Sequence, residues 1–347
     1  MARRLIDWPS AAVRLAEVLP RERLHPRVVA WAVHPRNRAT PWTVALSGGA
    51  DSLSVLLLLW GLWPEQRRRL RVVHFDHRLR GRSSMMDARF CAEVCHGLGL
   101  ALKMGRWDER PLKVSEATAR AARMAFFDQV LERQKESAIW FGHQQDDIAE
   151  TLLMRLARGS GTAGLAAPRP VQAISRRRVH LRPLLTLSKA EITQALTGAN
   201  IPWREDASNA RATFLRNRIR RSVVPAWSEA VAGRNVLQGA ALARELIEED
   251  DAALEEWTER LPLFTPAGAL RLAAIAGCPR AVKRRALARW LAQHQLVRAL
   301  SRQAVDALLQ AIERGGAARH SVGRDVFAVI RRGLLCIERR KVVKAQR

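Results

Sequence analysis

A short apolar segment, residues 43–46, runs into Ser-Gly-Gly-Ala-Asp-Ser and then directly into a leucine-rich segment, residues 53–63. The first segment has the composition of a buried strand, and the last has that of a buried helix. Two adjacent glycines allow the sharp turn between them, and the helix points its positive N-terminus at that turn. The junction therefore predicts an α/β fold with an anion-binding loop after one strand. The candidate phosphate-binding residues are Ser47, Gly48, Gly49, Ala50, Asp51 and Ser52.

This loop has two interpretations. In the first it binds pyrophosphate, and in the second it is an ordinary turn whose Ser and Asp residues cap the helix. It is not a Walker A loop, because no Gly-Lys-Ser/Thr sequence follows. Asp51 favours the first interpretation, since a carboxylate in an anion-binding loop is useful mainly as a ligand of Mg²⁺. Asp51 is therefore the candidate magnesium ligand.

Strand-like and helix-like segments alternate up to residue 158. We expect further strands at residues 70–75, 100–105 and 138–142, and helices at 84–98, 116–135 and 147–158. This alternation predicts a doubly wound parallel sheet whose ligands lie at the carboxyl ends of its strands. His74 ends one strand and His143 follows another, so we expect both near the loop. His74 and His77 have a metal-binding alternative, but no third ligand follows at a suitable spacing.

Charged side chains accompany the helices of this region. Asp147 and Glu150 are three residues apart at the start of a helix, so they share a face that could hold an ammonium group or a metal. Capping by first-turn acids is the alternative. Arg120 lies near Glu116 on one helix face, where a surface ion pair is the alternative to a functional role. Arg158 ends the last of these helices, where plain capping is the alternative.

The chain is strongly basic, with 59 Lys and Arg residues against 33 Asp and Glu residues and a formal net charge of +26. Such an excess favours a polyanionic partner, and arginine suits looped RNA because it stacks on bases and binds phosphates with two hydrogen bonds. A merely basic surface is the alternative. The candidate phosphate contacts in the densest basic run are Arg216, Asn217, Arg218 and Arg220.

Five motifs carry a resemblance to a known family. They are Ser-Gly-Gly-Ala-Asp-Ser from residue 47, His-Phe-Asp-His-Arg-Leu-Arg from 74, Gly-His-Gln-Gln-Asp-Asp-Ile-Ala-Glu-Thr from 142, Arg-Pro-Leu-Leu from 182, and Glu-Asp from 205 with Arg-Asn-Arg-Ile-Arg from 216. The first resembles the loop of PP-loop ATP pyrophosphatases. Together the motifs resemble tRNA(Ile)-lysidine synthetases, strongly over residues 42–225 and weakly beyond them.

The resemblance implies a ligase that joins free L-lysine to carbon 2 of the wobble cytidine of tRNA(Ile) with a CAU anticodon. It implies that the base oxygen attacks the α-phosphate of ATP, that pyrophosphate leaves, and that lysine then displaces AMP from the adenylated base. ATP and Mg²⁺ are the implied cofactors. No membrane is involved, and a homodimer is one assembly open to the chain.

Residue roles are implied position by position. The loop from Ser47 to Ser52 would bind ATP with His74 and His143. Asp147 and Glu150 would bind lysine, and one of them could take its proton. Arg120, Arg158 and Arg218 would neutralise the α-phosphate or AMP. The implied catalytic residues are Asp51, Arg120, Asp147, Glu150 and Arg218, and the implied tRNA contacts are Arg158, Arg216, Asn217, Arg218 and Arg220.

We expect three parts along the 347 residues. They are an N-terminal helical extension (1–40), a PP-loop ATPase catalytic domain (41–225) and a C-terminal helical domain ending in a small β-hairpin (226–347), which would bind tRNA. The longest apolar run, residues 55–63, is too short to span a bilayer, and we expect no targeting segment. The four cysteines give no zinc or disulfide pattern, so we expect a cytoplasmic protein.

Other functions remain open to this fold. A second PP-loop enzyme, such as a thiolase acting on tRNA, is one alternative, although the sequence lacks the Cys-x-x-Cys pair expected for an iron–sulfur cluster. GMP synthetases carry an amidotransferase domain that is not found here. A non-catalytic RNA-binding protein on a nucleotide-binding fold is the alternative from a different class, against which Asp51, Asp147 and Glu150 argue.

Overall fold

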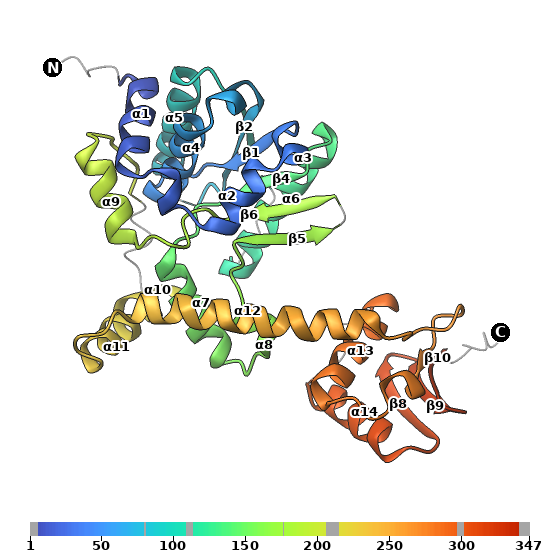
Figure 1. Cartoon of the computed structure of the whole chain (residues 1–347). Helices are drawn as coiled ribbons and strands as arrows, with labels where there is room; N and C mark the ends of the chain where they lie inside the picture. The colour runs from blue at the N-terminus through green and yellow to red at the C-terminus, as the bar shows by residue number, and fades with distance from the viewer. Residues whose placement is uncertain are drawn as a thin grey trace. The chain divides into compact units, whose positions relative to one another are not determined.

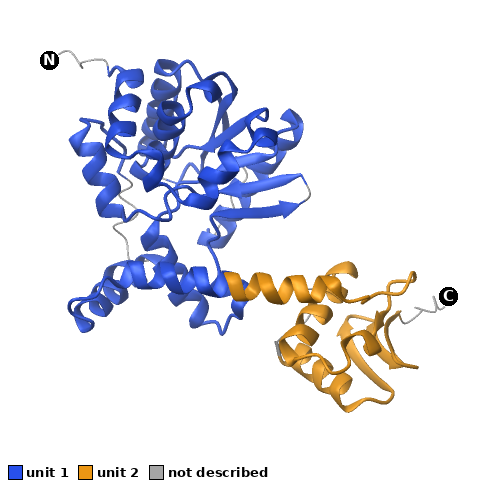
Figure 2. Cartoon of the chain, in the orientation of Figure 1, with its two compact units in different colours: residues 1–248 blue, residues 249–347 orange. Residues whose placement is uncertain are grey.

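The structure is a computed structural model that describes residues 6–79, 81–108, 114–175, 177–205, 215–296 and 302–339. Two compact units, Met1–Glu248 and Glu249–Arg347, make up the chain (Figure 2). The boundary between them falls inside a single helix, α12 (Val236–Arg260). Each unit has a hydrophobic core of its own.

A six-stranded sheet forms the centre of the first unit (Figure 1). Its strands are β1 (Trp42–Ala45), β2 (Leu70–Asp76), β3 (Ala101–Arg106), β4 (Ala138–Trp140), β5 (Val171–Ser175) and β6 (Arg178–Leu181). Their order is β3-β2-β1-β4-β6-β5, and every neighbouring pair is parallel except β5 with β6. The predicted doubly wound parallel sheet is confirmed. The antiparallel strand β5 was not predicted, because its residues are half-buried or exposed and give no clear core pattern.

Helices cover both faces of this sheet. In chain order the helical elements of the first unit are α1 (Trp8–Val18), η1 (Arg21–Arg23), α2 (Pro26–Val33), α3 (Pro35–Arg38), α4 (Ala50–Leu62), η2 (Pro64–Arg69), α5 (Arg82–Gly97), α6 (Glu116–Gln134), α7 (Gln145–Leu156), α8 (Thr162–Leu165), α9 (Lys189–Gly198), α10 (Leu215–Arg218), the π-helical η4 (Ile219–Val223) and α11 (Val224–Ala230). Successive strand residues alternate between two apolar clusters: Val72 packs with α1, α4 and α5, whereas Val73 packs with α6. The period of two in the strands therefore sets the two layers.

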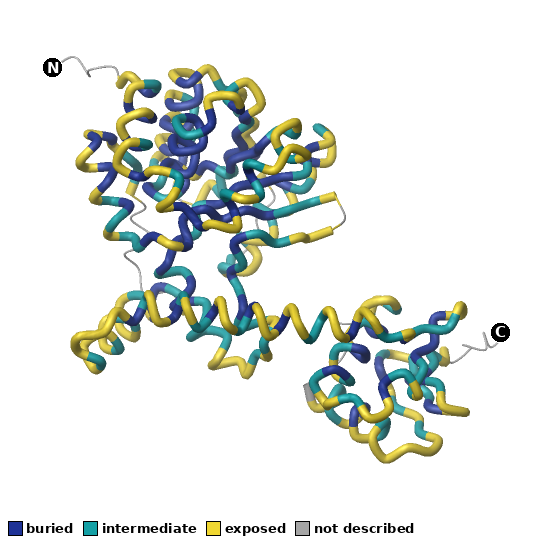
Figure 3. The backbone as a smooth tube through the Cα atoms, viewed as in Figure 1, coloured by how far each residue is buried: buried dark blue, intermediate teal, exposed yellow. Residues whose placement is uncertain are grey.

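The helix after the phosphate loop is buried almost all round (Figure 3). It lies against the sheet and is covered by α1, whose approach is so close that a Cβ on Gly61 would stand 2.7 Å from the carbonyl oxygen of Ala12. Trp8 and Leu15 of α1 are part of the same core. The N-terminal segment that we expected to be an extension is therefore built into the first unit, because it supplies a layer that α4 needs on its outer side.

The division between the units differs from the boundary expected near residue 225. Helix α11 and the first half of α12 belong to the first unit, where Trp227 and Ala240 pack against Ile148 and Leu185. The sequence predicted a helical segment after residue 226, but it could not indicate which core receives the apolar faces of its helices.

The second unit combines helices with a small sheet. Its remaining elements are β7 (Leu270–Arg271), η5 (Leu272–Ile275), α13 (Arg280–Gln293), α14 (Arg302–Arg314), β8 (Ala318–Gly323), β9 (Val326–Arg331) and β10 (Leu334–Arg339). The expected hairpin corresponds to β9 and β10, which belong to a four-stranded sheet of order β7-β10-β9-β8. Within the described residues, no helix of either unit is both long enough and apolar enough to cross a bilayer.

Candidate active site

The phosphate loop joins β1 to α4 and is shaped largely by its own backbone. Gly48 has a φ of +88°, which a residue with a side chain rarely adopts, and Gly49 caps α4. The Ser47 N–H donates to Ser52 Oγ at 3.0 Å, and the two serine hydroxyls lie 2.9 Å apart. No side chain among the described residues caps α4, so its first-turn N–H groups are open to an anion.

A second loop meets the first at the point where the strand order reverses. β1 lies between β2 and β4, and ligands of such sheets bind at this switch point. Gly142 follows β4, and a Cβ at this position would stand 2.7 Å from the backbone carbon of Asp51 and the backbone nitrogen of Ser52. Only glycine allows the two loops to touch. This contact brings α7, with Asp147 and Glu150, to the phosphate loop.

A third helix begins at the same place. The N–H of Gln145, the first residue of α7, donates to the carbonyl of Leu187 at 2.8 Å, and the N–H of Lys189, the first residue of α9, donates to Asp146 Oδ2 at 2.9 Å. The ammonium group of Lys189 lies 2.8 Å from Asp51 Oδ1. The N-termini of α4, α7 and α9 therefore converge on one edge of the sheet.

Lys189 was missed by the sequence reasoning, although a signal was present. The pattern Ser188-x-x-Glu191 forms a capping box and marks the start of a helix. A cation in the first turn opposes the helix dipole, so Lys189 stands where a lysine is disfavoured unless an anion is near. That anion is Asp51.

The pKa of Asp51 depends on charges from both α9 and the region of α7. Burial raises its pKa, and the adjacent ammonium of Lys189 opposes this rise. The charge of Asp147 raises the same pKa further, whereas that of Arg220 lowers it. Asp51 and the residues around Asp147 therefore form one electrostatic site.

Two arginines form ion pairs with the carboxylates that we expected to bind lysine. Glu150 is 1% exposed; its Oε2 accepts from Arg216 Nε at 2.6 Å, and its Oε1 accepts from Arg220 Nε at 2.5 Å. Arg216 Nη2 also donates to Asp147 Oδ1 at 2.8 Å. We call Asp147, Glu150, Arg216 and Arg220 the acid–arginine cluster. The sequence did not show that these candidate lysine ligands and candidate tRNA contacts pair with each other.

Further positive charge surrounds this cluster. Burial lowers the pKa of Arg123 and of Arg182 to about 10, which leaves both charged at neutral pH. Burial lowers the pKa of His143 well below 6.5, and the charges of Arg182 and Arg120 act in the same direction. His143 is therefore neutral, and the arginines that flank it favour an anion.

The remaining predicted residues are not part of the acid–arginine cluster. The His74 Nδ1 is 2.9 Å from the carbonyl oxygen of Leu46, so this buried ring supports the loop through its backbone. Arg158 is exposed after α7. Arg218 is exposed on α10, and the helical period puts it on another side from Arg216 and Arg220, whereas Asn217 is buried.

Asp51, the predicted magnesium ligand, lies in the first turn of α4 beside the phosphate loop. The described residues contain no group of three or more His, Cys, Asp or Glu side chains arranged for a metal. Magnesium is usually bound by one or two carboxylates together with the phosphates of the substrate, and Asp51 could supply one such carboxylate. In this structure the Asp51 carboxylate is paired with the ammonium of Lys189.

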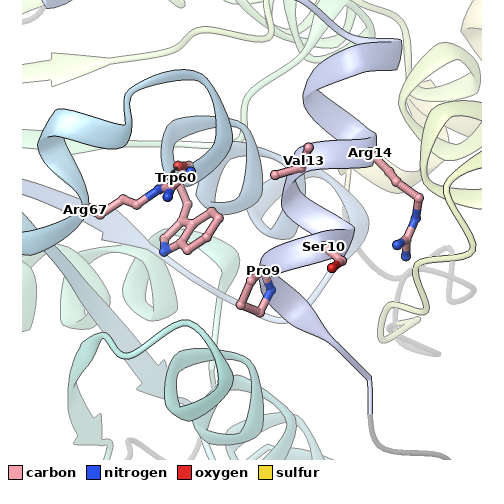
Figure 4. A pocket seen from close by; sticks show the side chains of 6 residues that line it. All are labelled: Pro9, Ser10, Val13, Arg14, Trp60 and Arg67. Atoms are coloured by element: carbon pink, nitrogen blue, oxygen red, sulfur yellow. Dashed lines mark hydrogen bonds between the residues drawn. The ribbon is translucent and has the colours of Figure 1, made fainter.

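A cavity of about 390 Å³ lies elsewhere, between α1 and the far end of α4 (Figure 4). Arg67 covers the ring of Trp60 at 3.6 Å and donates to its carbonyl oxygen, and Arg14 donates to Ala199. Trp60 follows Asp51 by nine residues of helix, which is about 14 Å. The charged groups of this cavity are already used in packing, so we place the site at the phosphate loop.

Comparisons with known proteins agree with this choice. A family model of the PP-loop domain matches residues 24–227, and a model of the TilS substrate binding domain matches residues 270–334. The tRNA(Ile)-lysidine synthase of Solibacter usitatus is 44% identical over 185 residues, which are 52% of this chain and 40% of that protein. The tRNA(Ile)-lysidine synthase of Gloeobacter violaceus is 37% identical over 254 residues, 72% of this chain and 75% of that protein.

The chain thus spans less than half of the Solibacter usitatus protein. Among solved structures, the U34-tRNA thiolase NcsA from Methanococcus maripaludis matches with a TM-score of 0.49 and 16% identity, over 69% of this chain and 78% of that chain. A likeness at this level carries no functional argument.

Proposed function

The chain belongs to the tRNA(Ile)-lysidine synthase family, and we propose that it joins lysine to carbon 2 of the wobble cytidine of tRNA(Ile) with a CAU anticodon, at the expense of ATP. The observation that carries this proposal is the convergence of three helix N-termini, the carboxylates of Asp51, Asp147 and Glu150, and several arginines at one sheet edge. Such a site can hold a nucleotide phosphate beside a group that recognises an amine.

The phosphate loop is the proposed site of the β- and γ-phosphates. The open N–H groups at the start of α4 would hold the leaving pyrophosphate, because a helix N-terminus stabilises negative charge. Asp51 is the residue placed to hold Mg²⁺, which when bound would neutralise charge on the phosphates. His74 contributes by fixing the carbonyl of Leu46, directly behind the loop.

Adenylation of the base is the proposed first step. The oxygen on carbon 2 of the cytidine attacks the α-phosphorus, and the bond between that phosphorus and the bridging oxygen of pyrophosphate breaks. Arg120, whose charge acts on the neutral His143, and His143 itself are the proposed donors to the α-phosphate, and Arg158 and Arg218 are candidates for contacts with AMP or tRNA. Because His143 is neutral, it can donate a hydrogen bond without adding another charge to the arginines around it.

Lysine transfer is the proposed second step, and it requires a rearrangement of the acid–arginine cluster. Asp147 and Glu150 bind the amines of lysine only when Arg216 or Arg220 leaves them, because Glu150 is buried beneath both guanidinium groups. The ε-nitrogen attacks carbon 2, the carbon–oxygen bond to AMP breaks, and a cluster carboxylate takes the proton. The released arginines then become free to bind RNA phosphates.

The tRNA would bind to basic residues of the chain. The excess of cations, the substrate binding domain match at residues 270–334 and the arginines of α10 and η4 support this. Asn217, buried between these arginines in the chain, would then act by orienting them. A cytoplasmic location and a homodimer remain predictions.

The thiolase alternative gains nothing from the geometry. A thiolase needs an exposed thiolate or a cluster of cysteines. Cys91 and Cys95 are buried, and burial raises the pKa of the Cys95 thiol to about 12, which makes it unreactive. Cys278 and Cys336 are half-buried and lie in the second unit, outside the matched PP-loop domain.

Release of AMP and pyrophosphate from ATP tests the proposal. Purified protein is incubated with a tRNA(Ile) transcript bearing CAU, with and without lysine, and the RNA is digested and examined by mass spectrometry for lysidine. Turnover that requires both substrates is expected. Pyrophosphate release that ignores lysine would contradict the lysidine assignment, and no ATP cleavage would favour a non-catalytic RNA-binding protein.

A further inference from the structure

The pair formed by Lys189 and Asp51 has no evident role in stability. Its side chains are 43% and 27% exposed, and an ion pair that is open to water contributes little to folding. Lys189 also stands in the first turn of α9, where the helix dipole opposes a cation. The ion pair and the helix position therefore give Lys189 no role in folding, and its place beside Asp51 points to a role in the site.

Backbone hydrogen bonds fix the position of Lys189. Its N–H donates to Asp146 Oδ2, and the N–H of Gln145 donates to Leu187, so the start of α9 is fastened to the start of α7. The start of α7 is in turn fixed against α4 by the contact of Gly142 with Asp51 and Ser52. The stem of Lys189 is therefore anchored beside the phosphate loop, while its ammonium group can move.

We propose that Lys189 is a phosphate-binding residue whose ammonium group moves from Asp51 to the β- or γ-phosphate when Mg²⁺ and a pyrophosphate-bearing nucleotide enter the loop. The ammonium lies 2.8 Å from a carboxylate in the first turn of α4, so an anion bound at that turn is within reach of the lysine side chain. A lysine suits this exchange because its ammonium is a compact point charge on a flexible stem. The move also frees Asp51 to contact a cation.

This inference rests on the proposed use of ATP, but it does not depend on lysine or tRNA as substrates. In the free protein, the ammonium balances the Asp51 carboxylate in a partly buried site. In the occupied site, a phosphate replaces Asp51 as the partner of the Lys189 ammonium, and the cation replaces that ammonium as the partner of Asp51. No charge is therefore left unpaired. Lys189 thus fills the site in the absence of ligand and binds the ligand in its presence.

Binding of inorganic pyrophosphate with Mg²⁺, measured by titration calorimetry without tRNA or lysine, tests the exchange. Lys189→Met keeps the apolar stem and removes the charge, Lys189→Arg keeps a charge, and Lys103→Met, on the exposed face of β3, is the matched control. We expect about tenfold weaker binding for Lys189→Met, a smaller loss for Lys189→Arg and no change for the control. Thermal unfolding confirms that each variant is folded.

Binding of Mn²⁺ in the absence of phosphate, followed by electron paramagnetic resonance, gives a second readout. Lys189→Met should bind Mn²⁺ more tightly than the parent protein, because the resident ammonium no longer competes for Asp51, and Asp51→Asn should bind it more weakly.

Two results would overturn the proposal: folded Lys189→Met that binds pyrophosphate as the parent does, or equal losses in the Met and Arg variants. A parent protein that binds neither ATP nor pyrophosphate would overturn both this inference and the proposed function. A parent that binds pyrophosphate but forms no lysidine would leave the role of Lys189 intact.

Discussion

The two halves of the site are built from different materials. The phosphate loop is made mostly of backbone: Gly48 has a positive φ, Gly142 has no room for a Cβ, and the N-terminus of α4 follows directly. The acid–arginine cluster is made of side chains, from α7 on one side and from α10 and η4 on the other, which neutralise each other. The loop is therefore formed in the absence of ligand, whereas the cluster would have to exchange partners to bind lysine as proposed. Three substitutions and a change of pH test this difference between the phosphate loop and the acid–arginine cluster.

The largest effect is expected from Glu150→Ala in the cluster. This carboxylate is buried and accepts from both Arg216 and Arg220, so its loss leaves two charges poorly paired. We expect a loss of about 3 kcal/mol in the free energy of unfolding, measured with urea, together with the loss of lysine binding. Glu132→Ala, an exposed acid on α6, should change stability by less than about 0.5 kcal/mol. Equal effects from both variants would show that the cluster is not a structural centre.

A smaller loss of stability is expected from Gly142→Ala at the loop. The new Cβ would stand 2.7 Å from the backbone at Asp51 and Ser52, which cannot yield without moving α4. We expect about 2 kcal/mol of destabilisation and weakened ATP binding, measured by denaturation and calorimetry. Gly239→Ala, where the helix α12 has open space, should be neutral or slightly stabilising. Unchanged ATP binding in Gly142→Ala would mean that the two loops need not touch.

Arg220→Gln should change two affinities in opposite directions. Removing one guanidinium from Glu150 leaves that carboxylate more available, so lysine should bind about tenfold more tightly by calorimetry. The same change should weaken tRNA binding in a filter assay, because the variant lacks one of the guanidinium groups that would bind RNA phosphates. Arg221→Gln, the next residue, should leave lysine binding unchanged. Weaker lysine binding in Arg220→Gln would indicate that the arginine orients the carboxylate for lysine instead of competing with it.

The smallest effect is expected from pH. Burial and the charges of Arg182 and Arg120 lower the pKa of His143 well below 6.5. As the pH falls through about 6.5, the unfolded chain binds a proton at this residue and the folded chain does not, so the folded state loses stability by up to about 1.4 kcal/mol per pH unit. His143→Asn should reduce this slope between pH 7 and 5, whereas His96→Asn, on the exposed face of α5, should not. An unchanged slope in His143→Asn would show that another group causes the pH dependence of stability.

The elements of the first unit could be predicted closely because their signals are local. The short apolar segments of the strands, the leucine-rich α4 and the Ser-Gly-Gly-x-Asp-Ser junction are signals of a few residues each, and each element was found at the expected place. The edge strand β5 and the extra strands of the second unit were not predicted, since short, half-exposed strands depend on partners that lie far along the chain.

What the sequence determined by itself is the backbone chemistry of the site: the loop that binds phosphate, the glycines that shape it, and the order of strands and helices that carries the loop to a sheet edge. What only the tertiary structure decided is which charges meet. Lys189 reaches Asp51 across 138 residues, and Arg216 reaches Glu150 across 66. A charge acts on whatever lies within a few ångströms, and distance along the chain places no limit on what that is. The pairing of side chains is therefore a property of the fold, whereas the phosphate loop is a property of six consecutive residues.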